Sequence, residues 1–344
     1  MFWIGLRYFH PTPNVGTRLS LRGSHEVSDY CFGSIRKRWT YKFQWDFVGG
    51  SQINLVDAWL QFRFNLFGRA VAWRGGRFGT TFGLENDGSA NGTLFMEQGF
   101  TLAFVPPQET GILLHSESQS RRWDLSFSSG ASELECLLCN VLAVTGRYST
   151  TFDFGRKDQL FHVGVNYSRR WTDDAVSYAA RPESHIAPVF VDTGPIASEG
   201  VDTALVEGAF LKGPYSLQGE YVVAGVKQPD EPRPVFYAFY VSGSYALTGE
   251  MRQYRHDLGT IRRIRPKREF RDGSGGLGAF EVAFRFSRID LNDQDITGGT
   301  LNDLTFAFNW YPTYPARVSF NMIRSKREAW NPVWIFQARL QLAY

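Results

Sequence analysis

The sequence predicts an all-β fold, a transmembrane antiparallel β-barrel, and three observations support it. Polar and apolar residues alternate with a period of two along the whole chain. Aromatic residues make up 16% of the 344 residues, and 34 glycines are spread among them, a composition that suits many short strands joined by turns. The alternation continues to the C-terminus, where Trp334, Phe336, Leu340 and Tyr344 share one face of a strand.

The predicted strands follow one another from residue 38 onward. In residues 38–47, "RWTYKFQWDF", the aromatic residues occupy every second position, and Lys42 and Asp46 lie on the opposite face. In residues 57–66, "DAWLQFRFNL", Asp57 and Arg63 oppose leucine and phenylalanine. Turn residues such as "GG", "NDG" and "YPTYP" separate the strands. The same alternation predicts strands at residues 122–129, 160–168, 215–223, 235–245, 279–287, 303–311, 317–323 and 334–344.

One face of these strands is polar, and the other is aromatic or aliphatic with few charges. A soluble β-sandwich also alternates, but about fourteen such segments are too many for one compact core of two sheets. In a bilayer only helices and closed barrels satisfy every backbone hydrogen bond. We therefore expect the apolar face to contact lipid and the polar face to line the lumen. Aromatic residues near strand ends are expected at the membrane interfaces, namely Trp39, Trp334, Tyr311 and Tyr344.

Composition and motifs argue against several other classes of protein. No apolar run approaches the roughly 20 residues of a membrane helix. The net charge of +3, without groove-reading or stacking motifs, predicts no nucleic-acid partner. The six histidines are dispersed, and none forms a nucleophile motif with serine or cysteine, so neither an enzyme activity nor a catalytic residue is predicted.

Neither a metal site nor a cofactor is predicted. The cysteines are Cys31, Cys136 and Cys139, and the last two form a "CLLC" with no second pair or histidine cluster to complete a zinc site. We interpret them as loop residues, and the sequence leaves open whether Cys136 and Cys139 form a disulfide. The start, "MFWIGLRYFHPTPN", lacks the pattern of a secretory signal. Either a signal has been removed or the N-terminus is incomplete, and both explanations stay open.

Several stretches resemble one protein family. "GRFGTTFGLEN", residues 76–86, is similar to the phosphate-selective porins, the bacterial outer-membrane porins O and P that take up phosphate and pyrophosphate. The strand ending at Tyr344 resembles the C-terminal aromatic signal that barrel-assembly machinery recognises. Other stretches match the same family in order: "WTYKFQWDF" from Trp39, "LFMEQ" from Leu94, "ARPESH" from Ala180, "GPYSLQGEY" from Gly213, "SYALTGE" from Ser244, "GAFEVAFRFSRIDLND" from Gly278 and "NDLTFAFNWY" from Asn302.

The resemblance implies a single barrel domain over residues 34–344, with sixteen strands, that forms a homotrimer in the bacterial outer membrane. It also implies that residues 83–98 are an infolded third extracellular loop that narrows the pore, a constriction loop with Glu85, Asn91 and Glu97 on it. Asn91 stands where porin P carries a lysine that helps to select phosphate, so general anion conduction is expected more than strict phosphate selectivity. Residues 1–33 match the family poorly and are predicted to be irregular.

Basic residues on the lumen face are the candidates for an anion pathway. Arginine suits phosphate because its planar fork donates paired, charge-assisted hydrogen bonds. The alternative is ion pairing within the wall, because Asp46, Asp57 and Glu281 lie on the same face. Parity predicts Lys42, Arg63, Arg147, Arg285 and Arg339, and the "GRF" and "RP" motifs of the resemblance add Arg77 and Arg181.

A basic stretch, residues 252–271, separates two predicted strands and is expected to be a long extracellular loop. Such a cluster would concentrate phosphate at the pore mouth. Binding to the phosphates of lipopolysaccharide, or simple solvation, explains it equally well. The cluster consists of Arg262, Arg263, Arg265, Lys267 and Arg268.

Together these features predict an outer-membrane porin, a passive diffusion channel selective for phosphate, pyrophosphate or related anions through a basic pore lining. A weakly selective general porin is one alternative. A non-conducting outer-membrane barrel that serves as a scaffold or surface binding protein is another. The expected partners are small anions, outer-membrane lipid, lipopolysaccharide and the other copies of a homotrimer.

Overall fold

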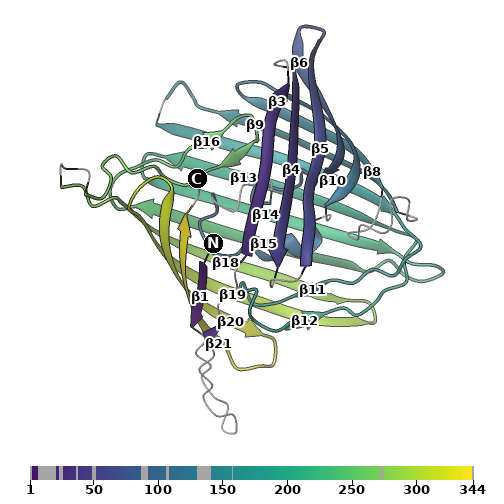
Figure 1. Ribbon diagram of the computed structural model, residues 1–344. Helices are drawn as coiled ribbons and strands as arrows, with labels where there is room; N and C mark the ends of the chain where they lie inside the picture. The colour runs from purple at the N-terminus through teal and green to yellow at the C-terminus, as the bar shows by residue number, and fades with distance from the viewer. Residues whose placement is uncertain are drawn as a thin grey trace.

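The computed structural model describes residues 2–6, 21–22, 26–35, 38–48, 52–86, 92–105, 108–129, 141–156, 158–271, 273 and 275–342. Long antiparallel strands dominate this part of the chain (Figure 1). No helix in the described ranges is long and apolar enough to cross a membrane. The all-β and antiparallel predictions are confirmed.

The strands have the following bounds. They are β1 (Phe2–Leu6), β2 (Leu21–Arg22), β3 (Glu26–Ile35), β4 (Trp39–Val48), β5 (Gln52–Leu66), β6 (Arg69–Phe78), β7 (Glu109–Glu117), β8 (Arg121–Ser129), β9 (Leu142–Phe152), β10 (Gln159–Trp171), β11 (Ala179–Ala180), β12 (Val191–Asp192), β13 (Gly200–Lys212), β14 (Tyr215–Lys227), β15 (Val235–Ala246), β16 (Tyr254–Arg255), β17 (Thr260–Ile261), β18 (Ala279–Asp293), β19 (Ile296–Tyr311), β20 (Ala316–Arg327) and β21 (Val333–Leu342). The 3-10 helix η1 (Phe100–Phe104) lies between β6 and β7.

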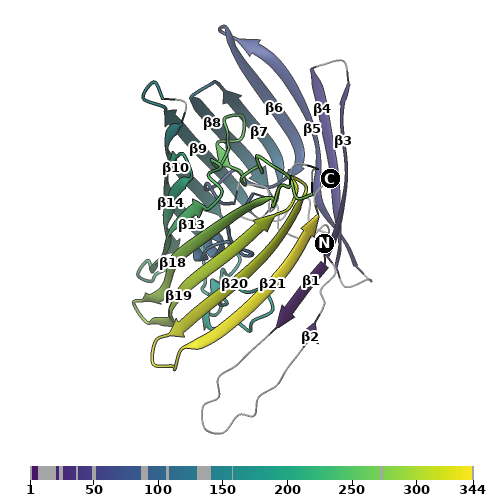
Figure 2. The ribbon, with the colours of Figure 1, turned by 90° about the vertical axis from the view of Figure 1, so that its left-hand side faces the viewer.

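Each long strand pairs with the next long strand along the chain, from β3 to β21, and β21 then pairs with β1. The described sheet has 17 strands instead of the predicted sixteen, because the short β2 joins it through two residue pairs with β1. Strand direction rotates strongly around the sheet, as sheet twist requires, and the sheet curls into a curved wall (Figure 2). No pairing between β2 and β3 is present among the described residues, so barrel closure stays a prediction.

The N-terminal segment contributes strands to this sheet. Phe2 pairs with Leu340 and Ile4 with Ala338, which places β1 beside β21. β3 pairs with β4 along its whole length. The prediction that residues 1–33 are irregular is therefore wrong for the described residues among them. Strand formation depends on the neighbouring strand more than on local pattern, and the weak alternation of this segment concealed it.

The connections lie at two ends of the sheet. The short connections at residues 67–68, 118–120, 153–158, 213–214 and 312–315 share one end, which we call the turn end. The longer connections at 79–108, 172–199 and 228–234 share the opposite end, the loop end. In outer-membrane barrels short turns face the periplasm and longer loops face outward.

The outward face of the sheet is apolar in the middle and aromatic toward its edges. On β18, Phe284 is 52% exposed whereas its neighbour Ala283 is 4% exposed, so the period-two pattern does separate the two faces. Trp310 lies on the outward side near the turn end and Trp334 near the loop end. The expectation for Tyr311 is wrong, because it points inward and its hydroxyl donates to Glu281 Oε2 at 2.9 Å. Tyr344 lies outside the described residues.

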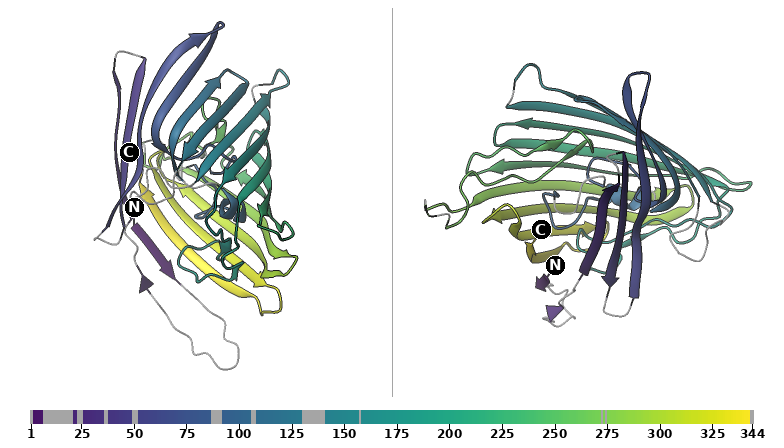
Figure 3. Two further views of the ribbon diagram at one scale, coloured as in Figure 1. Left: turned by 90° about the vertical axis from the view of Figure 1, so that its right-hand side faces the viewer. Right: turned by 45° about the horizontal axis from the view of Figure 1, so that its top comes forward.

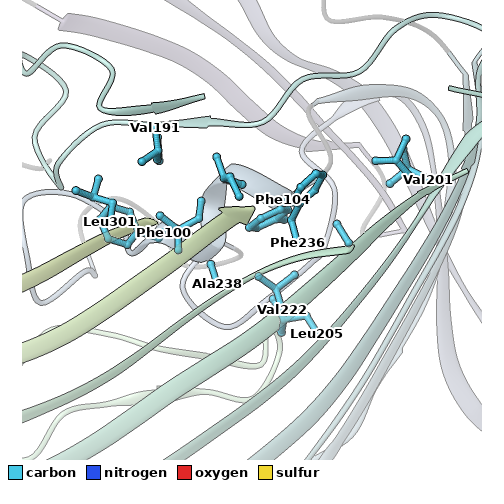
Figure 4. Close-up of a cluster of buried hydrophobic side chains, with 14 of the residues drawn as sticks. Phe100, Phe104, Val191, Val201, Leu205, Val222, Phe236, Ala238 and Leu301 are labelled. Atoms are coloured by element: carbon cyan, nitrogen blue, oxygen red, sulfur yellow. The ribbon is translucent and has the colours of Figure 1, made fainter. Parts of the chain in front are cut away.

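Two loops from the loop end fold into the curve of the sheet (Figure 3). Phe82, Phe100 and Phe104 of residues 79–105 are buried against inward side chains of the wall (Figure 4). Val191 of residues 172–199 joins the same cluster. The predicted infolding of the constriction loop is confirmed. A uniformly polar inner wall is not present, because the strands under these loops carry apolar inward residues such as Val222 and supply the loops with a hydrophobic core.

Candidate functional site

Glu85 makes hydrogen bonds both within the constriction loop and to the wall. Its backbone N–H donates to Glu220 Oε1 at 3.0 Å, and its side chain accepts from the Gly99 N–H at 2.8 Å. The Gln98 side chain donates to the Glu85 carbonyl at 3.0 Å, so the two ends of the loop are held together. Burial raises the pKa of Glu85, and the charge of Arg285 opposes this rise. Asn91, which the sequence also placed on the loop, lies outside the described residues.

Arg285 on β18 is a buried anchor for this loop. Its Nε lies 2.9 Å from Glu183 Oε2, its Nη1 lies 3.3 Å from Glu85 Oε1, and its Nη2 donates to the Glu97 carbonyl at 3.0 Å. The guanidinium also lies over the Phe95 ring at 4.3 Å. Both faces and the edge of this group are thus occupied. Arg285 is ion-paired, but its carboxylate partners lie on the infolded loops, whereas the alternative had expected them on the wall.

Glu183 was missed by the sequence analysis. It lies on the infolded segment 172–199, where its backbone N–H donates to Asp303 Oδ2 at 2.8 Å and its side chain accepts from Thr305 at 2.9 Å. The residue belongs to the "ARPESH" stretch, in which only Arg181 had been singled out. Arg181 itself is exposed, and its Nη1 donates to the His185 carbonyl at 2.8 Å.

Arg147 on β9 is also neutralised. Its Nη2 lies 2.8 Å from Glu207 Oε1 and 2.9 Å from the Gly259 carbonyl, so it ties the wall to residues 247–278. His162 Nε2 lies 3.2 Å from the same Glu207 oxygen. Arg147 therefore matches the alternative interpretation, ion pairing within the wall.

The remaining predicted pathway residues are dispersed around the sheet. Lys42 pairs with Asp57 at 2.6 Å, and both side chains keep some exposure. Arg63 is exposed near the turn at residues 67–68. Arg77 is half-buried, and its Nε donates to the Leu55 carbonyl at 3.1 Å. The structure does not bring these residues together.

Four arginines converge on the constriction loop. Each donates to one backbone carbonyl of residues 92–97, and two of the four, Arg252 and Arg317, had not been predicted. Arg317 lies on the polar parity of the predicted strand 317–323, so the alternation alone would have identified it. The contacts are Arg252 Nη2 to Gly92 O at 2.7 Å, Arg317 Nη1 to Thr93 O at 2.5 Å, Arg339 Nη1 to Met96 O at 3.0 Å and Arg285 Nη2 to Glu97 O at 3.0 Å.

The basic segment 247–278 lies at the turn end, opposite the entry of the constriction loop. Tyr215, directly after the turn at 213–214, pairs with Tyr245, and Ala279 pairs with Tyr311, directly before the turn at 312–315. Short turns face the periplasm in outer-membrane barrels, so this position argues against the predicted extracellular loop. Of its basic cluster, Arg263 is buried and Arg262 half-buried, while Arg265, Lys267 and Arg268 are exposed.

The constriction loop and the segment 247–278 meet inside the sheet. Arg252 of the segment reaches the Gly92 carbonyl, and Ile261 packs with Leu84 of the loop. A cavity of about 20 Å³, lined by these residues together with Glu85 and neighbours, lies at their contact. It has room for about one water molecule. The two inserted segments are therefore closely packed at this contact, and Arg252 is the arginine that lines the cavity.

Within the described ranges, no group of three or more histidine, cysteine, aspartate or glutamate side chains is arranged to hold a metal ion. Cys136 and Cys139 lie outside the described residues.

Comparisons with known proteins agree with this architecture. Residues 31–344 match the family model described as phosphate-selective porin O and P. Porin O of Pseudomonas aeruginosa is 26% identical over 200 residues, which cover 49% of this chain and 44% of that protein. An uncharacterized protein of Caulobacter vibrioides is 30% identical over 154 residues, which cover 44% of this chain and 30% of its own length. The chain spans less than half the length of either curated relative in these matches.

Solved structures of outer-membrane proteins share the fold at low identity. OprB of Pseudomonas putida has a TM-score of 0.65 at 10% identity, covering 100% of this chain and 93% of its own. The channel DcaP of Acinetobacter baumannii has a TM-score of 0.56 at 9% identity, covering 99% and 95%. A trimer form of OmpT of Vibrio cholerae has a TM-score of 0.53 at 11% identity, covering 99% and 98%.

Proposed function

The chain belongs to the phosphate-selective porin O and P family, and from this premise we propose that it is a passive channel for phosphate, pyrophosphate or related small anions. It is a porin of the bacterial outer membrane. The family description, phosphate-selective porin O and P, supports phosphate as one of the anions carried. No energy input is required, because the anions move down their own gradient.

The observation that carries this proposal is the ring of arginines around residues 92–97. Arg252, Arg285, Arg317 and Arg339 each donate to a carbonyl of the constriction loop, which concentrates guanidinium groups along this infolded loop. A pathway with several arginines binds an oxyanion well enough to replace part of its water and still releases it. Carboxylates neutralise part of this charge, since Glu281 pairs with Arg252.

A weakly selective general porin is the second candidate. The observation in its favour is that Arg147 and Arg285, two of the predicted pathway residues, are fully committed to Glu207 and Glu183. A non-conducting barrel that acts as a scaffold or surface binding protein is the third candidate, and the close packing of the two inserted segments favours it.

Reversal potentials of single channels in a salt gradient distinguish the three candidates. A strong anion preference supports the phosphate channel, a reversal potential near zero supports the general porin, and no conductance supports the non-conducting barrel. Addition of inorganic phosphate to a chloride solution then tests the anion class. A phosphate channel is expected to show lower chloride current, because phosphate occupies the arginine sites longer than chloride does.

The assembly and lipid contacts are part of the same proposal. We expect a homotrimer, for which the trimer form of the similar OmpT fold is a precedent. Outward residues such as Phe284 and Phe306 are exposed on the sheet and would contact lipid. Contact with lipopolysaccharide would use residues of the loop end, because the basic cluster at residues 262–268 lies at the turn end.

A further inference from the structure

Arg263 and Arg317 differ from four other buried arginines of this protein. Arg122, Arg147, Arg252 and Arg285 each pair with a carboxylate. Arg263 is 5% exposed and Arg317 is 0% exposed, yet neither makes an ion pair with a carboxylate among the described residues. They come from distant parts of the chain, the inserted segment 247–278 and β20.

Both guanidinium groups keep buried N–H groups without a partner. Arg263 Nη1 and Arg317 Nε have no hydrogen-bond acceptor in the described part of the chain. The other donors of Arg317 are used, since its Nη1 reaches the Thr93 carbonyl and its Nη2 donates to Gln341 Oε1 at 2.7 Å. A buried charged donor without an acceptor is strongly unfavourable, so an anion between these two groups would stabilise both of them.

The turn before β20 links the two arginines, because the ring of Tyr314, three residues before Arg317, lies 4.9 Å from the guanidinium carbon of Arg263. Burial lowers the pKa of Arg263, and the charge of Arg317 lowers it further. Two like charges in a buried position repel, and a bound anion removes that repulsion. Arginine is suited to this task, because its fork donates two parallel hydrogen bonds to an oxyanion.

An exposed arginine lies next to this pair. The guanidinium carbons of Arg263 and Arg265 lie 4.9 Å and 5.1 Å from the centre of the same Tyr314 ring. Arg265 is exposed whereas Arg263 is buried, so the Tyr314 ring contacts one solvent-exposed and one buried guanidinium group. Tyr314 belongs to the turn at residues 312–315, which places this group at the turn end.

We propose that Arg263 and Arg317 form an oxyanion-binding site at the turn end, beside Thr93 of the constriction loop, in which an anion such as phosphate rests before it leaves the protein. Arg265 serves as the neighbouring contact through which the anion exchanges with the periplasm. The site rests on the proposed function, and it assigns to the inserted segment 247–278 a role in anion release. The bound anion accepts hydrogen bonds from Arg263 Nη1 and Arg317 Nε and compensates their charge.

Phosphate binding to the full-length protein in detergent tests this site. Equilibrium dialysis with labelled inorganic phosphate is expected to give at least about tenfold weaker binding for Arg263→Gln, which loses the charge and the fork of one ligand. Arg263→Lys keeps the positive charge but not the guanidinium fork. It is expected to bind phosphate more tightly than Arg263→Gln and more weakly than the parent protein. Arg268→Gln is the matched control, because Arg268 lies on the same segment and is exposed. Its binding is expected to equal that of the parent protein.

Equal phosphate binding by Arg263→Gln and the parent protein would overturn the site, and so would equal losses in Arg263→Gln and Arg268→Gln. Arg317→Gln provides a second measurement and should weaken binding similarly. If that variant does not fold, the comparison of the Arg263 and Arg268 variants still decides. The reversal potential of the parent protein separates this result from the proposed function. Anion selectivity with unchanged binding in Arg263→Gln refutes the site alone, whereas no selectivity refutes the channel proposal.

Discussion

Replacement of Arg285 by alanine is expected to lower the free energy of unfolding by about 3–5 kcal/mol. The side chain is 1% exposed, and its Nη2 lies 2.5 Å from Glu183 Oε2 while its Nη1 lies 3.3 Å from Glu85 Oε1. Its removal leaves two buried carboxylates without their cation, and this unpaired charge accounts for most of the loss. The loss of the hydrogen bond to the Glu97 carbonyl adds a smaller contribution.

Unfolding in guanidinium chloride, followed by tryptophan fluorescence in detergent micelles, measures this change. Arg288→Ala is the matched control, because Arg288 lies on the same strand, faces outward with a side chain 35% exposed, and pairs with Asp290 at 3.1 Å. Such a surface pair contributes about 1 kcal/mol or less. Similar losses in the two variants would refute the conclusion that Arg285 is a buried anchor of the constriction loop.

Three further predictions follow from single contacts. Because burial raises the pKa of Glu85 above 4.5, its contribution to stability is fully present below pH 4.5 and is lost as the pH rises through the raised value. Glu85→Gln should therefore flatten the fall of the unfolding free energy with rising pH in that window, and an unchanged pH profile would contradict this. Gly76→Ala should lower the unfolding free energy by about 1–3 kcal/mol, because Gly76 has a φ of +128° and an added Cβ would lie 2.2 Å from the Ala58 carbonyl oxygen. Gly79→Ala, where nothing lies within 4 Å, is its control, and equal effects in the two glycine variants would disprove the steric argument. Arg252→Gln should raise single-channel conductance by loosening the contact between the two inserted segments, and unchanged conductance would show that this contact does not limit the current.

The period-two pattern predicted which residues face which side of the sheet. Phe284 is outward and Arg285 inward, as the alternation in "AFEVAFRFS" indicated. The interfacial expectation for Tyr311 departed from this pattern, because Tyr311 shares the parity of Thr305 and Asn309, whereas Trp310 has the outward parity. The structure places Tyr311 inward, where Glu281 accepts its hydroxyl proton.

The partners of the inward residues could not be predicted from sequence. Arg285 and Glu183 are 102 residues apart, and only the infolding of residues 172–199 brings them into contact. Local periodicity carries no information on such a contact. The same limit explains why only Arg285 and Arg339 of the predicted pathway residues reach the described part of the constriction loop, whereas Arg252 and Arg317, which also reach it, were missed.

The side of a loop depends on the number of strands that precede it. Each strand crosses the barrel once, so one strand overlooked reverses the side assigned to every later loop. The weakly patterned β3 was overlooked, and the length and charge of residues 252–271 then suggested an extracellular loop. The registers of β15 and β18 place the segment at the turn end instead.

Uptake of labelled phosphate into liposomes that contain the purified protein tests the central claim most directly. With no energy source, internal phosphate is expected to rise until it equals the external concentration, and to enter faster than potassium does when both are supplied. Phosphate entry no faster than into empty liposomes, or slower than that of potassium, would contradict an arginine-lined channel for small anions.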